Sequence, residues 1–144
     1  LAVRKAPPCY IFFLHWNWQV PQEILSQYEC VCFHMTDVPY GRGGSPLQNL
    51  IMDGKTETQV TALRMTEEMD AGPVYVKRPM SLEGRAEEIY LRAGAISWDL
   101  IFWMIANKPK PIPQTTVLYE HPIVSSTLPS TSAAPSTHSD KQQT

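Results

Sequence analysis

Apolar residues along the chain gather in short continuous runs separated by polar turns. Residues 10–14 form one such run and residues 29–33 carry a second. Runs of this length are typical of strands that are buried on both faces, as in parallel sheets. Residues 58–65 alternate between two faces, and residues 74–76 follow a turn, so both segments are predicted to be further strands.

Three other segments have the features of helices. Pro21 opens the first, and Ser45 is predicted as the N-cap of the second, with Pro46 at its first position. The longest helix is predicted over residues 86–107, where apolar side chains recur every three or four positions. They are Ile89, Tyr90, Ala93, Ile96, Leu100 and Trp103 or Met104. The order of the elements predicts an α/β fold with a mostly parallel sheet.

Composition changes near the C-terminal end and divides the chain into two parts. Residues 6–113 contain every predicted strand and helix, and the alternating prolines from 109 to 113 exclude a helix there. Residues 114–144 are predicted to be a disordered tail rich in Ser, Thr and Pro. From residue 125 onward, six Ser, four Thr and two Pro make up 12 of 20 residues, too few apolar groups for a core.

Charge and cysteine content exclude several classes of function. Twelve basic and 14 acidic residues give a net charge of −2, which offers no basic surface for non-specific binding of nucleic acid. No run of 18 or more consecutive apolar residues occurs, so a membrane partner is not predicted. Three cysteines, an odd number, do not suggest a disulfide framework, and we therefore expect a reducing, cytoplasmic compartment.

His34 follows the second predicted strand and is the first candidate for chemistry. Ligands of open α/β sheets bind at the carboxyl ends of strands, and strand alternation puts Cys30, Cys32 and His34 on one face. The loop at 35–44 carries Arg42 and three glycines, which let a ligand approach the backbone closely. The simpler interpretation, a strand end followed by a turn, stays open. The Cys and His residues lack a fourth ligand, so no metal site is predicted.

Asp70 and the aromatic end of the first strand are further candidates. Asp70 lies in the turn at 69–73, where Asp and Gly are also favoured for backbone reasons alone. A carboxylate beside a histidine fixes its tautomer, but the spacing does not place Asp70 beside His34. His15 and Trp16 end the first strand, where a planar heterocycle stacks or where the rings simply pack.

The segment FHMTDVPYGRGGSPLQNLI at residues 33–51 resembles the formyltransferases that use 10-formyltetrahydrofolate. Their pattern is Asn-x-His, then Leu-Pro, an Arg-Gly pair and a helix, followed later by an Asp-x-Gly turn. The residues that match are His34, Pro39, Arg42, Gly43, Asp70 and Gly72. The 36 positions between His34 and Asp70 also resemble the family's separation, whereas Cys32 stands where the family has Asn.

This resemblance implies an α/β fold that is the C-terminal part of a Rossmann-like formyltransferase domain. It also implies that a formyl group passes from 10-formyltetrahydrofolate to a primary amine. The acceptor would be a nucleotide amino sugar or a methionyl-tRNA, and only a tRNA would make nucleic acid a partner. The implied roles are catalysis for His34 and Asp70, cofactor binding for His15, Trp16 and Asp70, and substrate binding for Arg42 and Gly43.

Cys32 keeps two alternatives open. A thiol is a weak hydrogen-bond donor, and the loss of one oxyanion donor costs about 10²–10³ in rate. The first alternative is that the chain is a non-catalytic or truncated relative. The second is that it is a module that binds folate or a nucleotide without chemistry. The resemblance also implies that earlier strands of the domain pair with residues 10–14. We therefore expect residues 1–144 alone to be marginally stable or to self-associate, and to bind 10-formyltetrahydrofolate weakly if at all.

Overall fold

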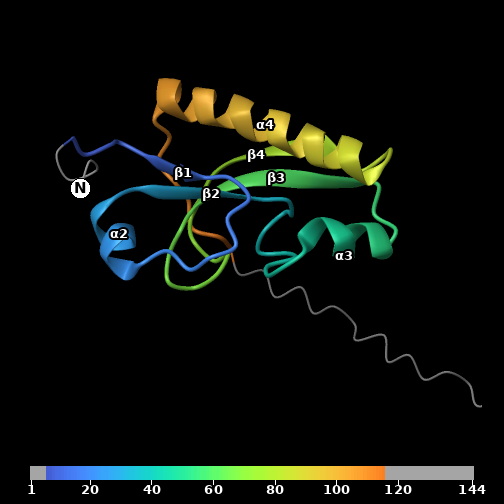
Figure 1. Cartoon of the computed structure of the whole chain (residues 1–144), viewed down its shortest axis with the longest axis horizontal. Coiled ribbons are helices and arrows are strands. Elements are labelled where there is room, and N and C mark those ends of the chain that lie inside the picture. Colours follow the sequence, from blue (N-terminus) through green and yellow to red (C-terminus); the bar gives the residue numbers. More distant parts are fainter. Residues whose placement is uncertain (1–5, 116–144) are drawn as a thin grey trace, which may run out of the picture.

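A four-stranded sheet lies between helices on its two faces (Figure 1). The computed structural model describes residues 6–115. Its elements are β1 (Ile11–Phe13), α2 (Gln22–Gln27), β2 (Cys30–His34), α3 (Pro46–Met52), β3 (Glu57–Arg64), β4 (Val74–Ser81) and α4 (Ala86–Asn107). α4 runs along one face, and α2 and α3 lie on the other side of the sheet. This order confirms the predicted α/β fold, and α4 has the predicted bounds.

The strands pair in the order β1-β2-β3-β4 with mixed directions. β1 and β2 are parallel, while β2 pairs antiparallel with β3, and β3 with β4. The predicted parallel character is therefore confirmed in part: within the described residues the sheet is mixed, and one pair of three is parallel. A parallel connection needs a crossover of about a dozen residues or more, and the segment at 65–73 between β3 and β4 is shorter. The connection from β2 to β3 stays at one end of the sheet.

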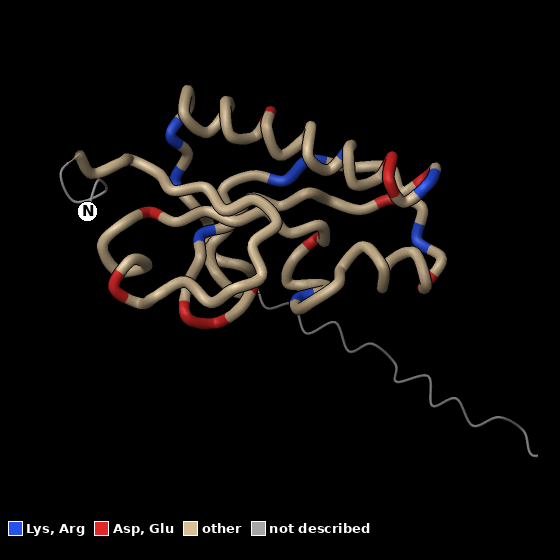
Figure 2. Tube along the Cα trace, in the orientation of Figure 1, with Lys and Arg blue, Asp and Glu red and all other residues tan. Residues whose placement is uncertain are grey.

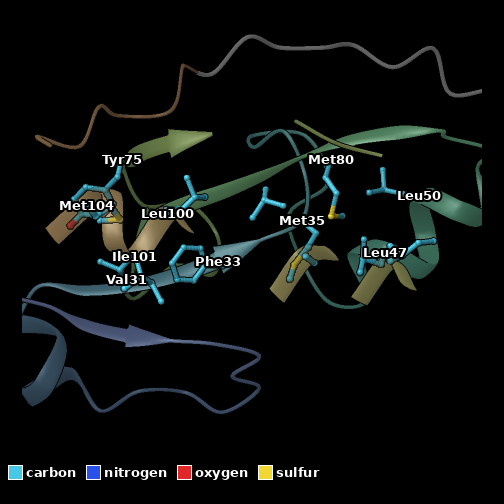
Figure 3. Close-up of a cluster of buried hydrophobic side chains, with 14 of the residues drawn as sticks. Val31, Phe33, Met35, Leu47, Leu50, Tyr75, Met80, Leu100, Ile101 and Met104 are labelled. Atoms are coloured by element: carbon cyan, nitrogen blue, oxygen red, sulfur yellow. The ribbon is translucent and has the colours of Figure 1, made fainter. Parts of the chain in front are cut away.

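The main core lies between the sheet and α4 and extends to α3 (Figure 3). Its members are Val31, Phe33, Met35, Leu47, Leu50, Val60, Ala62, Tyr75, Met80, Leu82, Ile89, Ala93, Leu100, Ile101 and Met104. Burying a large apolar side chain stabilises a fold by about 1.5–3 kcal/mol, so this cluster holds α4 on the sheet. Of the two alternatives at the end of the predicted stripe, Met104 is buried and Trp103 is exposed, and Tyr90 is corrected because it is exposed.

α4 is long and apolar enough to cross a membrane by length and composition alone. Core helices of globular proteins share this property, and α4 packs against β3 and β4. Its outer face nevertheless carries exposed apolar side chains, which include Leu91, Trp98, Phe102 and Ile105. Basic and acidic residues are interspersed along the trace rather than gathered by sign (Figure 2).

Candidate active site

Alternation along β2 separates the core from the candidate site. Val31 and Phe33 enter the apolar cluster, while Cys32 and His34 point to the other face of the sheet. There they line a cleft of about 1070 Å³. Asp70, from the turn between β3 and β4, lines the same cleft. The structure therefore brings together His34 and Asp70, which the spacing of the sequence did not place side by side.

Both ring nitrogens of His34 have partners, although the side chain is buried. Nε2 lies 2.8 Å from the carbonyl oxygen of Gly41. Nδ1 lies 3.5 Å from Oδ1 of Asp70. A carbonyl oxygen only accepts, so Nε2 carries a hydrogen and donates it to Gly41. The imidazolium form satisfies both partners, because its Nδ1–H faces the carboxylate.

The Asp70 carboxylate sits between a histidine and a backbone amide. Its Oδ2 accepts a hydrogen bond of 2.9 Å from the backbone N–H of Gly43. Asp70 itself has a left-handed backbone with φ of 54°, a conformation that persists where the surroundings hold it. Two residues later, Gly72 presses on β3, where an added Cβ would lie 1.8 Å from the carbonyl oxygen of Arg64. This turn therefore requires glycine at position 72.

Hydrogen bonds within the loop and from neighbouring strands hold the segment that carries Gly41 and Gly43. Thr36 Oγ1 donates to the carbonyl of Tyr40 at 2.7 Å. Thr61 Oγ1, from β3, donates to the carbonyl of Thr36 at 2.8 Å, and this contact is buried. Lys77, from β4, donates to the carbonyl of Val38 at 2.7 Å. The loop thus has a fixed path, which aims the Gly41 carbonyl at His34.

The Cys32 thiol is neutral at physiological pH. Burial raises the pKa of Cys32 to about 12, and the negative charge of Asp70 adds to the increase. A neutral thiol is a poor nucleophile and a weak hydrogen-bond donor. The strong polar groups of the site are therefore the imidazole, the carboxylate and the backbone amide, and not the thiol.

The other residues singled out in the sequence fall into two groups. His15, Trp16 and Gly43 line the cleft, and Trp16 packs edge-on against Phe13 with ring centroids 5.5 Å apart. Arg42 is not among the residues that line the cleft. Its guanidinium instead donates to Oε1 of Gln114, which lies beyond α4. Within residues 6–115, no cluster of three or more His, Cys, Asp or Glu side chains is arranged to hold a metal ion.

Gln114 is the residue of the site that sequence analysis missed. Gln114 is the first residue of the predicted tail, and its side chain bonds to Arg42 and to the turn of Asp70. The predicted tail beyond Thr115 lies outside the described residues. The prolines and threonines around Gln114 give no signal in the sequence that this side chain contacts the Arg42 loop and the Asp70 turn.

A histidine, a carboxylate and a backbone N–H beside an open cleft suit acyl transfer. Such chemistry needs a group that takes a proton from the attacking amine and donors that stabilise the negative charge on the carbonyl oxygen. Asp70 has the first property. When His34 is protonated, its positive charge meets the second need through space, because both of its ring nitrogens already face Asp70 and the carbonyl of Gly41.

Comparison with known proteins gives sequence relatives at about 30% identity and several similar structures. No protein-family model matches the chain. A methionyl-tRNA formyltransferase from Rickettsia massiliae (strain Mtu5) is 31% identical over 127 residues, which cover 83% of this chain and 42% of the relative. The chain thus spans about two fifths of the length of the curated relatives that it matches.

Two solved structures extend the comparison. Methionyl-tRNA formyltransferase from Clostridium thermocellum superposes with a TM-score of 0.76 at 45% identity, covering 78% of this chain and 50% of that one. HypX from Aquifex aeolicus in complex with tetrahydrofolic acid has a TM-score of 0.64 at 27% identity, covering 79% of this chain and 21% of that one. The similarity therefore includes most of the described residues.

Proposed function

Because this chain is a homologue of the formyltransferases and has their fold, we propose that it carries the catalytic part of an enzyme that transfers a formyl group. The donor is 10-formyltetrahydrofolate, and the acceptor is a primary amine on a methionyl-tRNA or a nucleotide amino sugar. The relatives are formyltransferases, and one similar structure contains tetrahydrofolic acid. The three free cysteines of this chain suit a cytoplasmic location.

The reaction runs through addition and elimination. The amine nitrogen attacks the formyl carbon, and the electron pair of the carbonyl moves to oxygen. The amine proton passes, directly or through a water molecule, toward Asp70. The positive charge of the His34 imidazolium stabilises the oxyanion through space, since its two N–H groups face Gly41 and Asp70. When the carbonyl re-forms, the bond to N10 of the folate breaks, N10 takes up a proton, and the products are the formamide and tetrahydrofolate.

The observation that carries this proposal is the pair of buried His34 and partly buried Asp70 at the cleft, with the Gly43 N–H on the second carboxylate oxygen. A transfer assay with the complete natural gene product tests it, using methionyl-tRNA and nucleotide amino sugars as acceptors. We expect His34→Ala and Asp70→Asn each to lower kcat by about 10²–10⁴-fold. Asp53→Asn is the matched control, because Asp53 is exposed at the end of α3.

Two outcomes overturn this assignment. If the wild type transfers no formyl group to any acceptor of the panel, the chain is not the catalytic part of such an enzyme. If Asp70→Asn retains the turnover of Asp53→Asn, proton transfer does not pass through Asp70.

His15 and Trp16 are proposed to bind the folate, because both line the cleft and Trp16 offers a half-exposed ring. Stacking on an aromatic ring contributes about 0.5–1.5 kcal/mol, so Trp16→Leu should raise KM for the donor roughly three- to tenfold. Trp103→Leu on α4 is the control, since Trp103 does not line the cleft. Equal KM values for the two variants would contradict the assignment. Gly43, which also lines the cleft, is proposed to contact the acceptor, while Arg42 is held by Gln114.

A second function, folate binding without transfer, is favoured by Cys32. Its neutral thiol stands where the resemblance expects an asparagine, so one oxyanion donor is missing. In this case the wild type binds 10-formyltetrahydrofolate but transfers nothing, and Cys32→Asn introduces activity. If the wild type is already active, Cys32→Asn should leave kcat unchanged or raise it, and the binding module is excluded.

A further inference from the structure

Gln114 occupies a junction between two loops that are distant in sequence. The segment after α4 is pinned to the sheet at Ile112, which exchanges backbone hydrogen bonds of 2.7 and 2.8 Å with Val74 at the start of β4. Two residues further on, the Gln114 side chain lies between the Arg42 loop and the Asp70 turn. Backbone pairing therefore sets where this side chain enters the site.

The amide of Gln114 uses all of its hydrogen-bonding groups there. Oε1 accepts from Nε of Arg42 at 3.1 Å and from Nη2 at 2.7 Å. Nε2 donates to the backbone carbonyls of Asp70 and Gly72, each at 2.8 Å. A carboxamide has two N–H donors and one acceptor oxygen with two lone pairs, so this set is complete. A carboxylate of the same size could keep the contacts with Arg42 but not those with the turn.

The two hydrogen bonds that Gln114 donates act on the part of the backbone that orients the Asp70 carboxylate. Asp70 has the left-handed φ of 54°, which a non-glycine residue keeps only where its surroundings hold it. The carbonyls that Gln114 ties down belong to Asp70 itself and to Gly72, at the tight contact with β3. The other end of the amide holds the residue next to Gly43, whose N–H binds the carboxylate.

We propose that Gln114 is a positioning residue: its amide ties the Asp70 turn to the Arg42 loop and thereby holds the Asp70 carboxylate against His34 and the Gly43 N–H. The inference deepens the proposed function and rests on it for its catalytic consequence. A misplacement of about 1 Å in a catalytic group costs on the order of 10²-fold in rate. Loss of the tie should therefore lower kcat, and leave KM for the folate, bound by other residues of the cleft, largely unchanged.

The test compares Gln114→Glu, Gln114→Ala and Gln27→Ala in the complete natural gene product. Gln27→Ala is the matched control, because Gln27 is an exposed glutamine at the end of α2 and does not line the cleft. Gln114→Glu keeps the size of the side chain and the acceptor for Arg42 but loses both N–H donors. We expect both Gln114 variants to lose kcat by about 10²-fold, with the melting temperature of Gln114→Glu close to that of the control.

A second measurement does not depend on catalysis. Hydrogen exchange of the Gly43 amide, followed by NMR, reports the bond from Gly43 to the Asp70 carboxylate. Without the tie, this exchange should become about tenfold faster in both Gln114 variants and stay unchanged in Gln27→Ala. Exchange as slow as in the wild type would overturn the inference.

The two measurements separate the possible failures. If the wild type shows no transfer but Gly43 exchange responds as expected, the proposed function fails and the positioning of Asp70 by Gln114 stands. If Gln114→Glu keeps full kcat while Gln114→Ala loses it, Gln114 acts through Arg42, and the inference about the Asp70 turn is wrong. If both variants keep full kcat, Gln114 has no part in positioning the carboxylate.

Discussion

Replacing Gly72 with alanine tests whether the turn of Asp70 depends on close contact with β3. The new Cβ would lie 1.8 Å from the carbonyl oxygen of Arg64 and 2.9 Å from its carbonyl carbon. Both are backbone atoms, and they cannot rotate away as the end of a side chain can. Arg64 is held in addition by its N–H bond of 2.9 Å to the carbonyl of Pro73 and by pairing with Val31 of β2. The turn must therefore move instead of the strand.

The size of the effect follows from this rigidity. Extra methyl groups in packed regions cost typically about 1–3 kcal/mol, and contact with backbone belongs at the upper end. A loss of about 3 kcal/mol in a folded unit of about 100 residues lowers Tm by roughly 12–24 °C. Turnover should fall even at temperatures where the variant is folded, because a displaced turn carries Asp70 away from His34 and from Gly43.

Thermal unfolding followed by circular dichroism measures the first effect, and Gly94→Ala provides the control. Gly94 lies within α4, and apart from its chain neighbours and the nearby backbone of its own helix no atom lies within 4 Å of an added Cβ. Alanine there should stabilise the helix by about 0.5–1 kcal/mol, because it reduces the freedom of the unfolded chain. Opposite signs of the two Tm changes are thus expected. A Gly72→Ala protein that melts at the wild-type temperature and keeps its turnover would refute the close contact.

Two further predictions concern Cys32 and the outer face of α4. Because the pKa of Cys32 is raised from 9.0 to about 12, iodoacetamide at pH 9 should alkylate it roughly 500-fold more slowly than an ordinary thiol. Asp70→Asn should speed this reaction, and a rate equal to that of exposed Cys9 in peptide mass spectrometry would contradict the burial. Because the pKa of Cys32 is higher in the folded state, its contribution to the free energy of unfolding is fully present below pH 9. This contribution is lost as the pH rises toward 12. On α4, the exposed rings of Trp98 and Phe102 stack with centroids 6.0 Å apart, so the isolated chain should self-associate through this face. The double variant Trp98→Lys with Phe102→Glu should weaken this association in light scattering, whereas the control Gln27→Lys should not. Unchanged association in the double variant would exclude this face.

The elements of the fold were predictable because their patterns are local. The apolar stripe of α4 repeats over the whole of Ala86–Asn107, and no distant residue is needed to recognise it. Strand directions are not local. β3 runs antiparallel to β2 because the connecting loop and α3 stay at one end of the sheet, where Thr61 binds the carbonyl of Thr36. Nothing in the composition of this loop predicts that path.

The site was predictable in part for the same reason. Strand alternation placed Cys32 and His34 on one face, and the structure confirms this. The pairing of His34 with Asp70 depends on where a turn between two other strands meets the end of β2, and only a family resemblance suggested it. Gln114 depends on a backbone bridge between Ile112 and Val74, which are far apart in the chain. A glutamine after a run of prolines gives no sign of such a bridge.

The contacts that hold His34 and Asp70 come mostly from backbone atoms. Gly41 supplies a carbonyl to His34 and Gly43 supplies an N–H to Asp70, while the Gln114 side chain binds two carbonyls of the turn. The Cys32 thiol is not one of these partners in the part of the chain that the structure describes. Asparagine at position 32 should therefore add a hydrogen-bond donor without moving the pair. Under the proposed function, Cys32→Asn changes the rate of formyl transfer, and the geometry of His34 and Asp70 should be the same in Cys32→Asn as in the wild type.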